Sequence, residues 1–131
     1  MSNKIDKILA EISAGELFDK ITILEIKKAK ISNKEKLINI NKELSSLNET
    51  VKKFIPDQSS ISKYINDLKN VNLKLWDVED GKRAAEKNKR FDEKFIELAR
   101  NVYKFNDERA KIKLKINEIL GSNIKEVKSH F

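Results

Sequence analysis

Cysteine is absent from this sequence, and histidine, proline and glycine are rare. Without cysteine the chain has no thiolate nucleophile, iron–sulfur ligand or Cys-ligated zinc site, and it suits a reducing compartment. Its single histidine, His130, excludes sites that need two or more imidazoles, such as the Glu-x-x-His pairs of di-iron bundles. One proline and three glycines leave long segments free of helix breakers. These absences favour a helical protein without covalent or histidine-dependent catalysis.

Long apolar runs and nucleotide-binding motifs are absent as well. The longest apolar stretches, such as Ile21–Leu24, fall far below the roughly 20 residues that span a bilayer. The first twenty residues have no apolar signal-peptide centre, and no glycine-rich phosphate loop or nucleophile elbow occurs. We therefore expect one soluble, cytoplasmic domain over residues 1–131, with no membrane partner and a hydrophobic core of its own.

The basic residues divide into two kinds. Of the 28 that give the net charge of +7, 24 are lysines, whose A/T-rich codons offer an explanation other than nucleic-acid binding. The four arginines, Arg83, Arg90, Arg100 and Arg109, all lie within residues 83–109. Arginine binds carboxylate or phosphate in a bidentate manner, so geometry matters most in this segment. Chance clustering with surface ion pairs is the alternative interpretation.

Helix boundaries can be predicted in the first half of the chain. Ser13 and Glu16 have the S-x-x-E form of a capping box, which predicts a helix from about Ala14. A second pair of this form, Ser32 and Glu35, coincides with a slip in the apolar pattern. We expect a kink or short turn over residues 31–34, and a single bent helix is the alternative.

The second half carries further boundary signals. Pro56 lies in a polar loop, and the next helix is expected from about Ser60 until the apolar pattern lapses at residues 87–89. The last helix is predicted from Phe91 to Leu120, followed by Gly121 as its C′ residue. The fold class is therefore all-α, an antiparallel bundle of three long helical arms. The first arm is kinked or broken near residues 31–34, and the crossing angles are shallow and coiled-coil-like.

The two ends of the chain have weaker patterns. Residues 1–12 are expected to form a short helix or an extended arm. In residues 122–131, Asn123 and Glu126 have the spacing of a cap pair and suggest one further helical turn.

Arg109 interrupts the apolar seam of the last helix. The seam consists of Phe91, Phe95, Leu98, Val102, Phe105, Arg109, Ile112, Ile116 and Ile119. A buried guanidinium needs a partner, because breaking such a pair costs about 3 to 5 kcal/mol. We expect a structural ion pair with Glu79 or Glu86. The alternative is an anion site in which Tyr103, Asn106 and Lys113 extend a donor-rich stripe.

Two other charged clusters lie beside apolar seams. Glu16 and Asp19 are three residues apart, so they could hold Mg²⁺, although we favour a simple complement to the helix dipole. Glu79, Arg83 and Glu86 continue the line of a buried helix face. We interpret this row as a solvated surface, with one wall of a ligand cleft as the alternative.

Four segments carry a family resemblance. They are ISAGELFDKITILEIKKAKI, LWDVEDGKRAAE, FDEKFIELARNVYKFNDERAKIKLKIN and GSNIKEVKS. Together they resemble a family of short, uncharacterised, all-helical proteins of bacteria and viruses, over residues 12–129. Some of its members stand beside glycosyltransferase or tetratricopeptide modules, which implies a link to cell-surface glycans. The resemblance implies no catalytic residues.

Fainter similarities concern two helical enzyme classes. The all-helical chorismate mutases hold a dicarboxylate with arginine and lysine side chains from several helices, but the positions in this chain match poorly. The MazG-like pyrophosphohydrolases need two Glu-x-x-Glu/Asp pairs around Mg²⁺. Glu16 and Asp19 supply one such pair, and no second pair fits.

Three functional hypotheses follow. The first is an interaction or accessory module, self-associating or binding a protein, whose polar groove is lined by Trp76, Arg83, Tyr103, Asn106 and Arg109. The second is a non-covalent enzyme or binder of an anionic metabolite, with Mg²⁺ as its only conceivable cofactor. Its anion-binding residues would come from Lys20, Trp76, Arg83, Arg100, Tyr103, Asn106, Arg109 and Lys113, and its acid, base or metal ligands from Glu16, Asp19, Glu79 and Glu86.

The third and least favoured hypothesis is a non-specific nucleic-acid binder, whose affinity for nucleic acid would fall steeply with salt.

Overall fold

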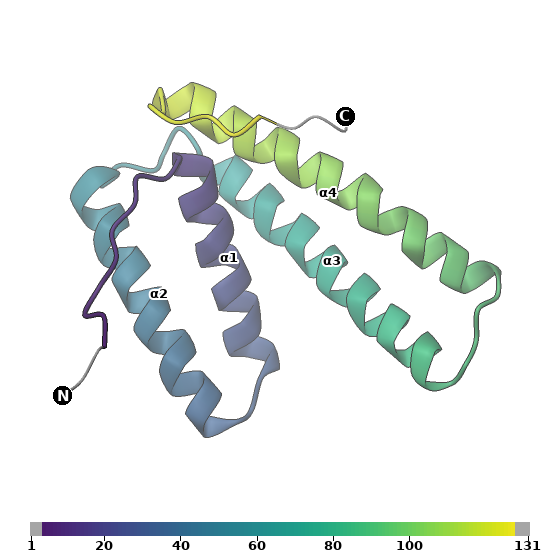
Figure 1. The fold of residues 1–131 in the computed structure, drawn as a ribbon. Coiled ribbons are helices and arrows are strands. Elements are labelled where there is room, and N and C mark those ends of the chain that lie inside the picture. Colours follow the sequence, from purple (N-terminus) through teal and green to yellow (C-terminus); the bar gives the residue numbers. More distant parts are fainter. Residues whose placement is uncertain (1–3, 128–131) are drawn as a thin grey trace.

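Four helices make up the regular structure of the computed structural model, which describes residues 4–127. They are α1 (Ala14–Lys30), α2 (Lys34–Phe54), α3 (Ser62–Lys87) and α4 (Glu93–Leu120), and the described residues contain no strand. The all-α class is therefore confirmed. Figure 1 shows two hairpins, α1–α2 and α3–α4, which meet at one end and diverge toward the other. The three-armed bundle with shallow crossing angles is not confirmed.

The helix ends follow local capping chemistry. Ser13 Oγ accepts a hydrogen bond from the Glu16 amide at 3.1 Å, as the first capping box predicts. Helical structure is interrupted between Lys30, the end of α1, and Lys34, the start of α2. The cap of α2 is Asn33, whose side chain accepts a hydrogen bond from the Lys36 amide at 3.0 Å. The predicted cap at Ser32 is therefore wrong by one residue, because the Asn33 carboxamide reaches the third amide of the helix.

The remaining boundaries differ slightly from the predictions. Pro56 lies between α2 and α3, and α3 begins at Ser62 instead of near Ser60. The last helix begins at Glu93 and not at Phe91, because Asp92 is its N-cap and accepts from the Phe95 amide. Gly121 ends this helix with φ of 62°, a left-handed conformation that glycine adopts without strain.

Helix α1 lies at the centre of the fold and packs against the other three helices. The buried apolar core consists of Leu17, Phe18, Ile21, Leu24, Ile40, Leu44, Val51, Ile61, Leu68, Val71 and Ile116. We call the part of the molecule around this core the proximal region. Buried side chains occur on several sides of α1, as expected for a helix enclosed by neighbours.

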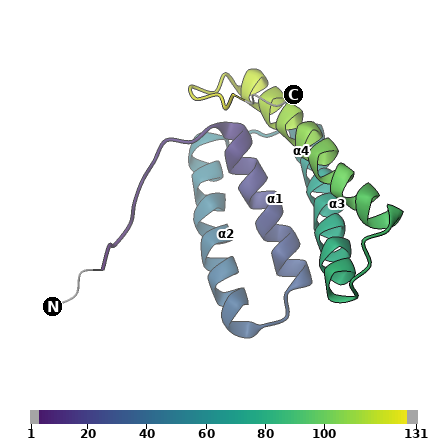
Figure 2. The same ribbon diagram turned by 45° about the vertical axis from the view of Figure 1, so that its right-hand side comes forward.

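Beyond the proximal region, α3 and α4 continue as a pair of helices (Figures 1 and 2). We call residues 78–105 the distal hairpin. Val78 is the only buried side chain among them. Gly81 allows α4 to approach closely, because a Cβ on this residue would lie 3.1 Å from Leu98 Cδ1. The distal hairpin therefore lacks the third helix that encloses the proximal region.

The described ends of the chain are not helical. Residues 4–12 are an exposed arm that leads away from the helices in Figure 2. Residues 122–127 form no helical turn, so the turn predicted there is wrong within the described residues. Asn123 instead donates to Glu11 at 2.6 Å, and Glu126 accepts from Lys113. His130 lies outside the described residues.

Candidate functional site

The centre of the proximal region contains a buried polar network around Asp19. This α1 carboxylate is 1% exposed. It accepts hydrogen bonds from the Arg109 guanidinium at both oxygens, with Nε to Oδ1 at 2.9 Å, and from Asn72 Nδ2 at 2.9 Å. Asn72 Nδ2 also lies 3.0 Å from Thr22 Oγ1, which in turn donates to the Asp19 carbonyl at 2.9 Å. The network thus joins α1, α3 and α4.

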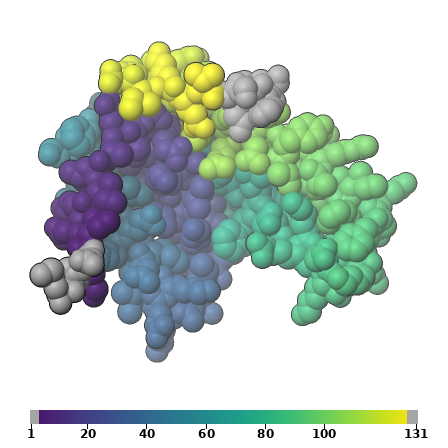
Figure 3. Space-filling view, in the orientation of Figure 1, coloured from purple at the N-terminus to yellow at the C-terminus, as the bar shows by residue number. Residues whose placement is uncertain are grey.

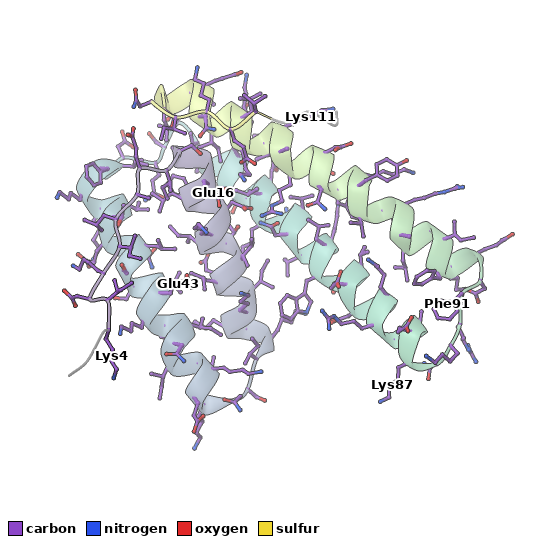
Figure 4. The ribbon with its side chains drawn as sticks, viewed as in Figure 1. Lys4, Glu16, Glu43, Lys87, Phe91 and Lys111 are labelled. Atoms are coloured by element: carbon purple, nitrogen blue, oxygen red, sulfur yellow. The ribbon has the colours of Figure 1, made fainter. Side chains whose placement is uncertain are left out.

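Lys113 forms a second centre one turn further along α4. Its Nζ lies 2.6 Å from Glu16, 2.9 Å from Glu126 and 3.8 Å from Asp19. Figure 4 labels Glu16 near the start of α1, where this helix meets α4. Glu16 also pairs with Lys20 at 3.6 Å. Three carboxylates thus face three cations, so the cluster is balanced in charge.

The protonation of Arg109 and Lys113 follows from these contacts. The hydrogen bonds with Asp19 raise the pKa of Arg109 above its ordinary value, despite the opposing effect of burial. Burial alone would lower the pKa of Lys113, but hydrogen bonds to Glu16 and Glu126 more than offset this and raise it. Both side chains are therefore held in their charged forms.

The first turn of α1 is attached to the end of α4. The Gly15 amide donates to Asn117 Oδ1 at 2.6 Å, and the Ala14 amide donates to Ser122 Oγ at 3.1 Å. A Cβ on Gly15 would lie 2.9 Å from Asn117 Oδ1 and closer still to the Lys113 carbonyl oxygen. Glycine is thus required here for close approach of the two helices.

The predicted partner of Arg109 is wrong. Glu79 lies 3.6 Å from Arg83 and 4.0 Å from Lys82, both on its own helix, and Glu86 pairs with Lys89. The partner is Asp19, because α1 packs against both α3 and α4 and carries this carboxylate into the core. The sequence does contain one indication that Asp19 is buried, because this residue directly follows the apolar residues Leu17 and Phe18.

The structure brings together some of the predicted site residues and separates others. Trp76, Glu79, Asn106 and Arg109 line one pocket, of about 300 Å³, between α1 and the α3–α4 pair. Figure 3 shows the surface hollowed between these two parts of the molecule. The predicted residues that do not line this pocket are Glu16, Asp19, Lys20, Arg83, Glu86, Arg100, Tyr103 and Lys113.

Sequence analysis missed two polar residues that line this pocket, Lys27 and Asn72. Asn72 lies on the polar row of α3 and its role depends on contact with Asp19, which no local pattern reveals. Lys27 lies in the last turn of α1, where a lysine is ordinary as a complement to the helix dipole. Within residues 4–127, Lys27 forms no ion pair.

The acidic residues of the network are bound by cations of the chain itself. Glu16 and Asp19, the pair considered for Mg²⁺, face Lys113 and Arg109. The described residues contain no group of three or more His, Cys, Asp or Glu arranged to hold a metal ion. In that same part of the chain, no buried side-chain nitrogen or oxygen lacks a hydrogen-bond partner. The acidic groups of the network are thus paired with cations of the same chain.

The remaining findings concern membrane-spanning helices and similarity to known proteins. No helix among the described residues is both long and apolar enough to cross a membrane. No curated protein and no solved structure matches the chain. A family model does match residues 8–130, under the description "Family of unknown function (DUF6165)", in agreement with the resemblance to an uncharacterised family. The chain belongs to this family, DUF6165.

Proposed function

We propose that this protein is a cytoplasmic interaction module that associates with a second copy of itself. In each pair, residues 5–12 of one copy fold as a helix on the distal hairpin of the other. The observation that carries the proposal is the exposure of the apolar side chains in residues 5–12. The absence of cysteine suits the reducing cytoplasm.

The apolar pattern of this segment is helical, although its conformation is extended. Ile5, Ile8, Leu9 and Ile12 recur at steps of three, one and three, which places them on one face of a helix. In the extended arm they remain in solvent, with Ile8 77% and Leu9 86% exposed. Burial of such side chains stabilises a complex by about 1.5 to 3 kcal/mol each. The segment therefore has the character of a helix that forms on binding.

The distal hairpin offers a surface for such a helix. Its seam of Phe91, Phe95, Leu98, Val102 and Phe105 has near-heptad spacing and is not fully buried between α3 and α4. Ile96 and Tyr103 on α4 are also exposed. A third helix packed at a shallow angle would give this hairpin the coiled-coil-like, three-helix arrangement that its spacing favours.

The dimensions of the two parts agree. Eight helical residues extend about 12 Å, and so do the eight residues of α4 from Ile96 to Tyr103. A single copy thus carries both an uncovered helix-forming segment and a hairpin that lacks one helix. If two copies related by a two-fold axis each place residues 5–12 on the distal hairpin of the other, both segments and both hairpins are covered. The assembly then closes at two copies.

The pairing of charges within the polar network favours this function over catalysis. Asp19, Glu16, Arg109 and Lys113 neutralise one another, so the cluster provides no free acid or base. These contacts support a structural role for the residues that were the candidates for acid–base or metal chemistry.

Sedimentation equilibrium of the full chain over a wide concentration range tests the proposal. We expect a monomer–dimer equilibrium that Leu9→Asp abolishes. Ile38→Asp is the matched control, because Ile38 is 68% exposed on α2 and belongs to neither of the two proposed surfaces. A chain that stays monomeric at every concentration contradicts the proposal, and so does a dimer that is equally stable with Leu9→Asp.

A further inference from the structure

We infer that the pocket between α1 and the α3–α4 pair binds a small organic anion. Its carboxylate or phosphate lies between Lys27 and Arg109, and its apolar or aromatic part lies against Trp76. Of the seam proposed for self-association, Val102 alone also lines this pocket.

Unused hydrogen-bond donors define the polar side of the pocket. The guanidinium of Arg109 has five N–H groups, of which three are used, two toward Asp19 and one toward Asn106 at 3.3 Å. Asn106 accepts this last bond through Oδ1, so its amino group is left as a donor. Lys27 adds three donors and, within residues 4–127, no ion pair. A pocket rich in unused donors selects a ligand rich in acceptors.

The balance of charge favours an anion as well. The charge of Arg109 is compensated by Asp19, and that of Glu79 by Arg83 and Lys82. The charge of Lys27 is not compensated by any residue between 4 and 127. The lining therefore has an excess of one positive charge, which a carboxylate or phosphate would neutralise.

Apart from Asn72, the rest of the lining is apolar. Ile23, Ile26, Leu75 and Val102 contribute aliphatic surface beside the Trp76 indole. A volume of about 300 Å³ accommodates a small ligand, at the lower end of the range for ligand pockets. The combination of few convergent donors with an apolar and aromatic wall is typical of a site for a compact anion with a hydrophobic group.

Trp76 is the only tryptophan of the chain, so its fluorescence reports directly on the pocket. We would titrate the full chain with phenyl phosphate, phenylacetate and, as the uncharged analogue, benzyl alcohol. We expect a saturable change in emission with at least one of the two anions and much weaker binding of benzyl alcohol. Comparison of the two anions identifies the preferred charged group.

Variants of Lys27 separate binding from folding. We expect Lys27→Ala to weaken anion binding about tenfold or more, and Lys27→Arg to retain most of it. Lys30→Ala is the control, because Lys30 is an exposed lysine in the same turn. The inference is overturned if neither anion saturates, if benzyl alcohol binds as tightly as the anions, or if Lys27→Ala leaves the affinity unchanged. Self-association is measured separately and does not depend on this result.

Discussion

The two ends of the α3–α4 pair are built from the same two helices, yet their surroundings differ. In the proximal region α1 covers the pair, and the interior includes a hydrogen-bonded polar network of Asp19, Asn72, Arg109 and Lys113. In the distal hairpin no helix of the same chain covers the pair, and the charged residues form ion pairs at the surface. The same pair of helices, α3 and α4, therefore forms part of an enclosed core at its proximal end and an open surface at its distal end.

The largest effect is expected from Arg109→Met in the proximal region. It would leave the Asp19 carboxylate buried and without its bidentate partner, at a cost of about 3 kcal/mol or more in the free energy of unfolding. Arg83→Met removes only an exposed pair with Glu79 and should cost less than about 0.5 kcal/mol. Chemical denaturation of both variants checks this contrast, and equal losses would contradict it.

The two helical glycines provide a second contrast. Gly15→Ala places a methyl group against the Lys113 carbonyl and Asn117, which are fixed parts of α4, and should destabilise the protein by about 2 kcal/mol. Gly81→Ala meets only the side-chain end of the partly exposed Leu98 and gains helix propensity, so its stability should change by less than about 1 kcal/mol. Thermal unfolding of each variant distinguishes the two, and a larger loss for Gly81→Ala would reverse the comparison.

Alkaline pH should weaken the proximal region through Lys113. Its pKa is raised above the ordinary 10.5 by Glu16 and Glu126, so the folded state binds this proton more tightly than the unfolded state does. The resulting stability is fully present below pH 10.5 and is lost as the pH rises through the higher folded pKa. Lys113→Met should remove this part of the pH dependence of the free energy of unfolding, whereas Lys104→Met on the distal hairpin should retain it. Denaturation as a function of pH gives the comparison.

The smallest effect on monomer stability is expected from Ile96→Ser on the distal hairpin. Because Ile96 is exposed in the single chain, the free energy of unfolding should change by less than about 0.5 kcal/mol at low concentration. Self-association should weaken clearly, since Ile96 lies on the surface proposed for the partner's segment. Unfolding and sedimentation of the same variant check both statements. A strongly destabilised monomer with unchanged association would contradict them.

Local patterns predicted most of the fold. The Ser13 cap, the break at residues 31–34, the loop at Pro56 and the end at Gly121 all depend on interactions within a few residues, so they can be predicted from the sequence. The same reasoning missed Asn33 and Asp92 as caps. Ser32 is a good capping residue next to Asn33, and Phe91 continues the apolar pattern next to Asp92, so each neighbour was chosen as the helix boundary.

The site was predictable only in part. The seam of α4 identified Arg109 as a cation in need of a partner, which is correct, although its side chain is only partly buried. Its partner, Asp19, lies 90 residues away in the chain and depends on how α1 packs against α3 and α4. No helical periodicity specifies that packing, so Glu79 and Glu86 were the wrong choices. The role of Lys27 in the pocket depends on the same arrangement.

Hydrogen–deuterium exchange of the full chain at low and high concentration tests the central claim most directly. At low concentration the amides of the proximal region should exchange slowly, while those of residues 5–12 and of the distal hairpin should exchange fast. At high concentration residues 5–12 and the distal hairpin should become protected together. If residues 5–12 exchange freely at every concentration, or if the distal hairpin is as protected as the proximal region in the monomer, the account is wrong.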